Sequence, residues 1–409
     1  MKRINYIKSC SLGLSIYVFL AIFIKIAWAS PAVRGCPEPG PPIKLGFIAS
    51  TSAPFAPFYK AQETALMIGI DEINKRGGVC GKRKLKLYTR DYDYKPAVSA
   101  IIAEELITNE KVDFLIGPMH AVSAQQVTKI AKKYNKVCLF PASHAAKLTI
   151  KMAHPFMLQI PPSTYMKGKA VGMYLSDQPY KKYISLGSKS ILDIEEAKSW
   201  KEYMAKKVKE FRLTKSVTVE PMTKDFSAQV LEILDARPDA VFCTLRWRSL
   251  VEFMSQAKEM GFFKKTAFVG SFDLNVLQAM KDQMPSGLIG YSEAPFYAID
   301  TPEMRSFSHA FMQRTGSWPP EVAIMAYDSL LVLVKAIEQA GDIDSLSVAK
   351  VLRTLTFRGL QGKKSINPKY NMVNSGLYVG KTFKDPKYPF SILSQVKYFP
   401  AEKLWESLN

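Results

Sequence analysis

Short apolar segments alternate with longer amphipathic segments along most of this chain, and this alternation constrains the fold more than any other feature. The first apolar segment, 43–49, has the length of one buried strand. The next segment has core positions at the i, i+3, i+4 and i+7 spacing of one helix face, namely Leu66, Gly69, Ile70 and Ile73. It ends at Gly77-Gly78, because glycine permits the left-handed cap of a helix. This alternation predicts a parallel sheet covered by helices.

The alternation occurs in two successive stretches, which predict two doubly wound α/β units. The first stretch has further strand patterns at 84–87, 112–116, 137–141 and 156–160, and helix patterns at 96–106 and 121–134. The second has strand patterns at 183–186, 217–221, 240–245 and 266–270, and helix patterns at 193–211, 227–234 and 250–260. The length of 409 residues also fits two domains better than one.

The last third of the chain indicates how the two units are connected. Three helical patterns follow the strand-like segment near residue 287, at 302–315, 320–340 and 345–355. These helices need a sheet to cover, so we expect them to return to the first unit and the tail to return to the second. The predicted first lobe is 43–161 with 289–370, and the predicted second lobe is 162–288 with 371–409. The chain would then cross three times between lobes that enclose a cleft.

The segment 1–29 has the pattern of a secretory signal. Three basic residues precede an apolar run at 10–24, and Ala27-Trp28-Ala29 predicts cleavage after Ala29. Lys25 interrupts the end of the apolar run, and a short uncleaved anchor is the alternative that the sequence leaves open. We expect an exported, periplasmic protein.

The chain is strongly basic, with a formal net charge of +20 that falls to +16 without residues 1–29, which hold four basic and no acidic residues. The lysines are scattered singly or in pairs such as Lys181-Lys182, with no long basic tract. This distribution argues against nucleic acid as a partner and favours a solvated basic surface. Such a surface can attract an anionic solute or an acidic partner.

Four cysteines remain after the predicted signal, at positions 36, 80, 138 and 243. They form no C-x-x-C and have no nearby histidine pair, so we expect no metal or redox cofactor. Cys138 and Cys243 lie in apolar runs and are predicted to be buried thiols. Cys36 precedes the first strand and Cys80 follows the first helix, which returns the chain to the same end of the sheet. These two cysteines can therefore form a disulfide in an oxidising compartment.

Five short segments carry a family resemblance. They are Ile43-Lys-Leu-Gly-Phe, Ile70-Asp-Glu-Ile-Asn-Lys-Arg-Gly-Gly, Phe114-Leu-Ile-Gly-Pro, Gly287-Leu-Ile-Gly and Ala326-Tyr-Asp-Ser-Leu. Their order and spacing, from residue 43 to about 399, resemble the type I periplasmic solute-binding proteins of the leucine/isoleucine/valine-binding kind, which serve branched-chain amino-acid ABC transporters. The resemblance implies two α/β lobes joined by a three-strand hinge. Such a monomer closes on a small solute and presents its closed form to an inner-membrane permease.

The resemblance also implies ligand-binding positions in the loops that follow the strands. Carried over loop by loop, they fall on Phe58, Tyr59, Ala121, Val122, Ala142, Ser143, His144, Ser190, Ile191, Arg246, Trp247, Phe272 and Asp273. Ala121 stands where amino-acid binders usually have a serine that holds the ligand carboxylate, and the tyrosine expected near Ser190 is missing. An acidic residue that pairs with a ligand ammonium is expected near Phe272, where Asp273 stands.

The remaining polar and aromatic positions predict a planar or apolar ligand with an anionic group, as readily as an amino acid. Arg246 is expected to pair with that group bidentately, and the rings of Phe58, Tyr59 and Trp247 to stack on the ligand. Each residue also has an ordinary structural alternative. His144 can cap a loop, and Arg246 can lie on Trp247 at the surface without any ligand.

Two other functions are compatible with the same fold. A ligand-sensing partner of a membrane receptor uses the same clamp, and an enzyme can be built on many α/β scaffolds. The sequence has no G-x-S-x-G, H-E-x-x-H, Walker or G-x-G-x-x-G motif. Its four histidines, at positions 120, 144, 154 and 309, show no ligand spacing. We therefore expect a non-enzymatic solute-binding component of an ABC transporter, with sensing as the alternative.

Overall fold

The computed structural model describes residues 37–51 and 55–405. The predicted signal segment and Cys36 lie outside these described residues. None of the helices within the described ranges combines the length and the apolar character that a membrane crossing requires.

Two mixed sheets organise the described chain. The eight-stranded sheet has the order β11-β12-β13-β5-β4-β3-β1-β2. Its strands are β1 (Ile43–Ala49), β2 (Leu85–Asp91), β3 (Phe114–Ile116), β4 (Cys138–Phe140), β5 (Met157–Gln159), β11 (Thr356–Gly359), β12 (Gly362–Asn367) and β13 (Met372–Val373). The strands β1 to β5 are parallel, and β3, β4 and β5 are buried along their whole length, as expected for strands covered on both faces.

The seven-stranded sheet has the order β15-β14-β10-β9-β8-β6-β7. Its strands are β6 (Lys182–Ser188), β7 (Arg212–Val219), β8 (Ala240–Cys243), β9 (Ala267–Ser271), β10 (Ile289–Ser292), β14 (Leu377–Phe383) and β15 (Ile392–Phe399). The strands β6 to β10 are parallel, whereas β14 runs antiparallel to both β10 and β15.

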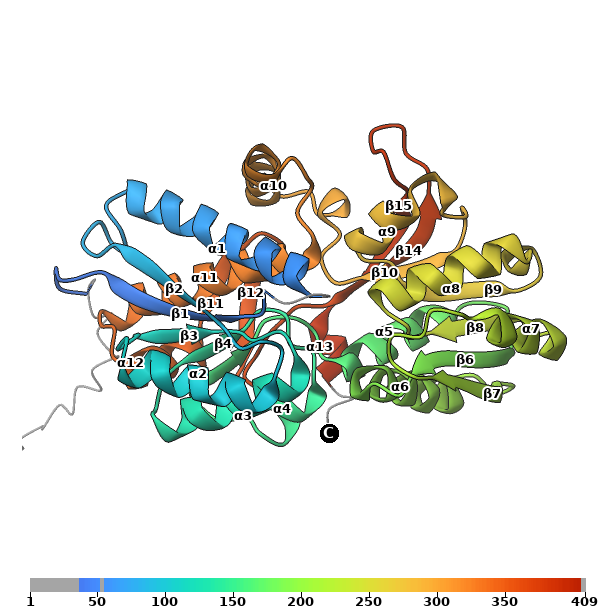
Figure 1. Cartoon of the computed structure of the whole chain (residues 1–409), viewed down its shortest axis with the longest axis horizontal. Coiled ribbons are helices and arrows are strands. Elements are labelled where there is room, and N and C mark those ends of the chain that lie inside the picture. The colour runs from blue at the N-terminus through green and yellow to red at the C-terminus, as the bar shows by residue number, and fades with distance from the viewer. Residues whose placement is uncertain (1–36, 52–54, 406–409) are drawn as a thin grey trace, which may run out of the picture. The chain divides into compact units, whose positions relative to one another are not determined.

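Helices cover both faces of each sheet (Figure 1). We call the eight-stranded sheet with its helices the first lobe. Its helices are α1 (Ala56–Lys75), α2 (Pro96–Thr108), α3 (Ala121–Lys133), α4 (Ala146–Ile150), α10 (Pro302–Thr315), α11 (Glu321–Ala340) and α12 (Ser345–Leu352). The seven-stranded sheet with its helices is the second lobe. These are α5 (Thr164–Leu175), α6 (Ile191–Lys207), α7 (Ser227–Ala236), α8 (Trp247–Glu259), α9 (Leu274–Met280), α13 (Ala401–Leu404), and the short 3₁₀ turns η1 (Phe262–Lys264), η2 (Lys281–Gln283) and η3 (Phe296–Ala298), of which η3 leads back to the first lobe.

Glycine permits the closest helix contacts in each lobe. In the first lobe α1 and α11 lie side by side on one face of the sheet (Figure 1). A Cβ added at Gly69 of α1 would lie 2.7 Å from the side chain of Leu330 of α11. In the second lobe α5 packs on α6, and a Cβ added at Gly168 would lie 2.3 Å from the carbonyl oxygen of Glu196.

The chain crosses between the lobes three times, as predicted from the sequence. The crossings lie between β5 and α5, between β10 and η3, and between β13 and β14. Two predicted boundaries were placed a few residues too early. Residues 289–292 form β10 and pair with β9 and β14 in the second lobe, and residues 372–373 form β13 and pair with β5 in the first. A short strand that precedes a crossing belongs to the sheet it pairs with, and pairing is not visible in the apolar pattern.

Three helices of the second lobe were not predicted, and two of them, α5 and α9, contribute residues to the cavity described below. The helix α5 contains Gly168 and Gly172, which lower helix propensity, and its contacts with α6 require them to be small. The helix α9 has seven residues, so it shows barely two turns of periodicity. Both helices lie beside the cavity described below, and their absence from the prediction affected the predicted site.

The thiols of Cys138 in β4 and Cys243 in β8 are free and completely buried, as predicted. Burial raises the pKa of both thiols, so neither is a reactive thiolate near neutral pH. Because Cys36 lies outside the described residues, its bond with Cys80 remains a prediction.

Candidate functional site

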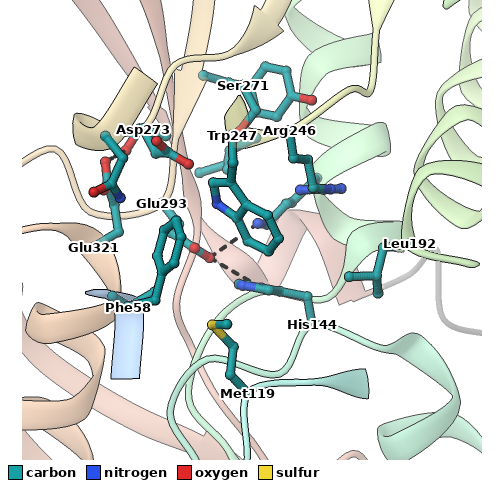
Figure 2. Close-up of a pocket in the computed structure, with 16 residues that line it drawn as sticks. Phe58, Met119, His144, Leu192, Arg246, Trp247, Ser271, Asp273, Glu293 and Glu321 are labelled. Atoms are coloured by element: carbon teal, nitrogen blue, oxygen red, sulfur yellow. Dashed lines mark hydrogen bonds and ion pairs between the residues drawn. The ribbon is translucent and has the colours of Figure 1, made fainter. Parts of the chain in front are cut away.

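A cavity lies where the carboxyl ends of strands from both lobes come together (Figure 2). This is the edge at which open α/β sheets usually bind ligands, because the strand-to-helix loops converge there. The first lobe contributes Phe58, Met119, His144, Glu321 and Val322. The second lobe and the crossings contribute Lys167, Leu192, Arg246, Trp247, Ser271, Asp273, Asn275, Tyr291, Ser292, Glu293 and Leu377.

Glu293 occupies the centre of the cavity, directly after β10 at the second crossing. Its Oε2 lies 3.3 Å from Lys167 Nζ of α5 and 3.4 Å from His144 Nδ1 of the first lobe. The three side chains are at most 11% exposed. Burial raises the pKa of Glu293, and the nearby Lys167 ammonium opposes this increase. Side chains from both lobes therefore meet on one carboxylate, as Figure 2 shows.

His144 is uncharged in this environment. Burial lowers the pKa of its imidazole well below the ordinary value, and the charges of Lys167 and Arg246 lower it further. Its Nδ1 lies 3.2 Å from the carbonyl oxygen of Pro162. Because a carbonyl oxygen can only accept a hydrogen bond, Nδ1 carries the proton of the neutral ring and donates to it. The contact with Glu293 is thus a polar contact of a neutral ring.

Arg246 already has two carboxylate partners. Its Nε donates to Asp193 Oδ1 at 3.2 Å, and its Nη2 donates to Glu196 Oε2. Burial acts to lower the pKa of Arg246, but Glu196 and Asp193 hold it above the ordinary value. Tyr291 also donates to Glu196. Arg246 lines the cavity as predicted, but its charge is matched by the protein itself.

Asp273 and Glu321 form a second acidic group on the opposite side of the cavity from Arg246 (Figure 2). Asp273 caps α9 by accepting a hydrogen bond from Val276 N at 3.0 Å. Glu321, the first residue of α11, accepts from Leu274 N at 3.1 Å and from Ser292 Oγ at 2.7 Å. Glu321 therefore connects the first lobe to α9 of the second.

The environment of this acidic group favours protonation. Burial raises the pKa of Asp273 to about 6 and that of Glu321 to about 8. Repulsion by Glu293 adds to the increase at Asp273, and repulsion by Asp273 adds to the increase at Glu321. Among the described residues, neither carboxylate has a basic side chain within 4.0 Å. The pair titrates as a unit near neutral pH.

An aromatic group bridges the lobes at the edge of the cavity. The ring of Trp247, at the start of α8, lies 5.0 Å from the ring of Phe58 and 5.4 Å from that of Phe55, measured between centroids. Phe55 is stacked in turn on Tyr94 at 4.6 Å. Trp247 has a φ of 51°, which is rare for a bulky residue. Of the three rings expected at the ligand, Phe58 and Trp247 come together here, whereas Tyr59 does not line the cavity.

Five of the predicted ligand positions line the cavity: Phe58, His144, Arg246, Trp247 and Asp273. The other eight do not line it. Tyr59, Ala121, Ala142, Ser143 and Phe272 are buried, Val122 and Ile191 are exposed, and Ser190 is the N-cap residue of α6. Tyr59 has a structural partner, because its hydroxyl lies 2.6 Å from that of Tyr92. Phe272 packs on Phe268.

Three charged residues that line the cavity were not among the ligand positions predicted from the sequence. Lys167 lies on α5, which was not predicted. Glu293 directly follows the strand β10, and a charged residue directly after a strand is a pattern in the sequence that could have indicated a ligand position. Glu321 starts α11 after two prolines, and only the tertiary structure brings this helix end to the cavity.

Comparison with known proteins decides the family. Residues 42–386 match the family model described as periplasmic binding protein. The chain belongs to this family. The fold class and the family predicted from the sequence are therefore confirmed, and the described α/β lobes are those of a type I periplasmic binding protein.

Relatives of this periplasmic binding protein carry names of amino-acid binders. The leucine-, isoleucine-, valine-, threonine- and alanine-binding protein of Pseudomonas aeruginosa is 23% identical over 84% of this chain and 90% of its own length. A Leu/Ile/Val-binding protein homolog of Brucella suis is 24% identical over 84% of this chain and 88% of its own length.

Solved structures with the same fold were determined with two kinds of ligand. A solute-binding protein of an ABC transporter from Rhodopseudomonas palustris, in complex with 3,4-dihydroxybenzoic acid, has a TM-score of 0.79, 20% identity, and covers 88% of this chain and 97% of its own. The branched-chain amino acid transporter substrate-binding protein of Streptococcus pneumoniae, in complex with isoleucine, has a TM-score of 0.75, 19% identity, and covers 88% of this chain and 99% of its own.

Proposed function

We propose that this periplasmic binding protein is the substrate-binding component of an ABC transporter and captures a small solute, an amino acid or an aromatic or other organic acid, between its lobes. The observation that carries the proposal is the convergence of both lobes on Glu293. His144 approaches it from the first lobe and Lys167 from the second, at 3.4 and 3.3 Å. A buried polar cavity assembled from two lobes suits a solute that is enclosed when the lobes close.

The mechanism that we propose is hinge closure at the three crossing segments. A solute that contacts both lobes binds the closed form more tightly than the open form, and so shifts the population toward it. The contact between Trp247 and Phe58 is an apolar part of this closure, because one ring belongs to each lobe. The five predicted positions that line the cavity are the proposed ligand contacts. Among them Arg246 acts chiefly through its ion pairs with Asp193 and Glu196, which hold these two side chains in position.

The same proposal extends to location and partners. The family is described as periplasmic binding protein, a similar solved structure is an ABC transporter substrate-binding protein, and the segment 1–29 has the pattern of an export signal. We propose that the exported protein is a monomer that presents its closed form to an inner-membrane permease. The basic charge of +16 favours an acidic surface on that partner.

A ligand screen by thermal shift tests the proposed function. The exported chain, from residue 30, is mixed with amino acids, aromatic acids, short dicarboxylates, amides and amines. A ligand at about 100 times its dissociation constant stabilises the folded state by about 2.7 kcal/mol, so the melting temperature is expected to rise by a few degrees. If no compound of these classes changes the melting temperature or gives a calorimetric signal, the proposed function is contradicted.

A disulfide between Cys36 and Cys80 is the second part of the proposal that can be tested alone. Alkylation of the unfolded, unreduced protein is expected to label two thiols, those of Cys138 and Cys243, because these are free. Alkylation after reduction is expected to label four. Mass spectrometry of an unreduced digest should contain one peptide pair joined through Cys36 and Cys80. Four labels without reduction would refute the bond.

A further inference from the structure

The basic side chains that line the cavity are already matched by carboxylates. Lys167 lies 3.3 Å from Glu293, and Arg246 contacts both Asp193 and Glu196. A ligand carboxylate would therefore compete with protein carboxylates for both cations. It would also enter next to Glu293, which would repel it.

Two further carboxylates of the cavity have no cation. In the part of the chain that the structure describes, the side-chain oxygens of Asp273 and Glu321 accept hydrogen bonds from neutral groups, among them Val276 N, Leu274 N and Ser292 Oγ. Within the described ranges no basic side chain lies within 4.0 Å of either. The cavity and its immediate support thus contain more carboxylates than basic groups, since His144 is neutral.

A second observation, independent of the charge balance, concerns Glu293. Its Oε2 is buried and lies 3.3 Å from Lys167 Nζ and 3.4 Å from His144 Nδ1, which also faces the carbonyl oxygen of Pro162. A carboxylate oxygen has more than one acceptor site, so Oε2 can accept a hydrogen bond from a donor of the ligand in addition to its contact with Lys167. Figure 2 shows this oxygen at the centre of the cavity, between the Phe58 ring and His144.

The aromatic lining agrees with the same kind of ligand. Phe58 and Trp247 present rings 5.0 Å apart, and aromatic faces attract cations. In contrast, the first turn of α3 does not line the cavity, and Ala121 at its start is 4% exposed. Free N–H groups at a helix start are a common way to hold an anion, and this one is closed to the cavity.

We propose that the cavity selects an organic cation, an amine or quaternary ammonium with an apolar substituent, held by Asp273 and Glu293 and by the rings of Phe58 and Trp247. A ligand carboxylate is not required. This inference rests on the proposed function, because it needs the cavity to be the solute site. It goes beyond the solutes named there, because an amine without a carboxylate is neither an acid nor an amino acid.

Cation binding is linked to proton release. A cation beside Asp273 and Glu321 favours their charged forms, so protons leave the pair as the ligand enters. Affinity for a cation is therefore expected to increase as the pH rises toward about 8, the pKa of Glu321 without ligand, and to be constant above it. The charged and titratable groups that face the pair are Glu293, Lys167, Arg246 and Tyr297.

Matched ligands test the inference by isothermal titration calorimetry of the exported chain at pH 8. One set is 3-methylbutan-1-amine, leucine and 4-methylpentanoate, and the other is 2-phenylethylamine, phenylalanine and 3-phenylpropanoate. We expect at least one amine to bind, and the acid of its set to bind at least 100-fold more weakly. An acid that binds as tightly as its amine overturns the inference and leaves the proposed function standing. An amino acid that binds while its amine does not overturns it as well. Binding by none of the six contradicts both.

Asp273→Asn tests the proposed contact. Asparagine is as good an N-cap as aspartate, so α9 should keep its cap while the charge is lost. We expect affinity for the amine to fall at least tenfold. Asp344→Asn is the matched control, because Asp344 caps α12 by accepting from Ser347 N at 2.9 Å, away from the cavity. It should bind like the wild type.

A second variant covers the case in which Asp273→Asn does not fold, as judged by its melting temperature. Glu293→Gln removes the other proposed contact and should also weaken the amine at least tenfold. Its affinity for the matched acid should not fall. Unchanged amine affinity in a folded Asp273→Asn or Glu293→Gln protein would overturn the assignment.

Discussion

Replacement of Arg246 by methionine is expected to lower the free energy of unfolding by about 3–5 kcal/mol, because it leaves the carboxylates of Asp193 and Glu196 buried without a cation. The side chains of these carboxylates are 5% and 0% exposed, so water cannot replace the guanidinium. The deficit should become smaller as the pH is lowered, since protonation removes the uncompensated charge. Urea denaturation of the wild type and the variant, at several pH values, measures both effects.

Two further variants control this experiment. Arg305→Met removes an exposed arginine paired with Asp300 and should cost at most about 1 kcal/mol, because surface ion pairs contribute little. The triple variant Arg246→Met with Asp193→Asn and Glu196→Gln should regain part of the stability that the single variant loses. A single variant as stable as the wild type would show that Arg246 is not the structural partner of these carboxylates. That result would support the role first expected of Arg246, namely binding the anionic group of a ligand.

Glu321→Gln is expected to change the dependence of stability on pH. The pKa of Glu321 is raised by burial from its ordinary value to about 8 in the folded state. The folded state therefore binds more protons than the unfolded state between about pH 4.5 and 8, and the free energy of unfolding falls as the pH rises through this window. Glutamine can accept the same hydrogen bonds from Leu274 N and Ser292 Oγ without a charge. The variant should gain on the order of 3 kcal/mol relative to the wild type between pH 5 and pH 8.

Denaturation curves at pH 5, 6, 7 and 8 measure this difference. Glu338→Gln is a suitable control, because Glu338 is paired with Lys335 at the surface and its replacement should give curves parallel to those of the wild type. Asp328→Asn provides a buried control with another window. The pKa of Asp328 is raised by burial to about 6, so its effect should level off at about pH 7, whereas that of Glu321 continues to pH 8. If Glu321→Gln and the wild type keep a constant difference from pH 5 to pH 8, Glu321 does not titrate in that range.

These two predictions concern opposite sides of one cavity. On one side an arginine and two carboxylates neutralise each other, and on the other two carboxylates share hydrogen bonds without a cation. The first arrangement gives rigidity and the second leaves charge available to a ligand. The difference explains why an arginine at the predicted position does not by itself indicate an anionic solute.

The sequence alone determined the architecture, because the apolar and amphipathic patterns of single elements are local. The strand at 43–49 and the helix at 302–315 have the bounds that the patterns predict, and the three crossings follow from the order of the elements. The positions that the family resemblance implies include Phe58, His144 and Trp247, which line the cavity.

Only the tertiary structure decided the chemistry of the cavity. Lys167 lies on α5, a helix that the sequence pattern did not predict because its glycines lower helix propensity. Glu321 reaches the cavity from α11, which begins far along the chain. The partners of Arg246 lie 50 and 53 residues away, on α6. Charge balance in a buried site depends on distances between such side chains, and no local pattern records them. The alternation of strands and helices therefore predicts that a cleft exists, and the folded chain decides which charges in it remain unmatched.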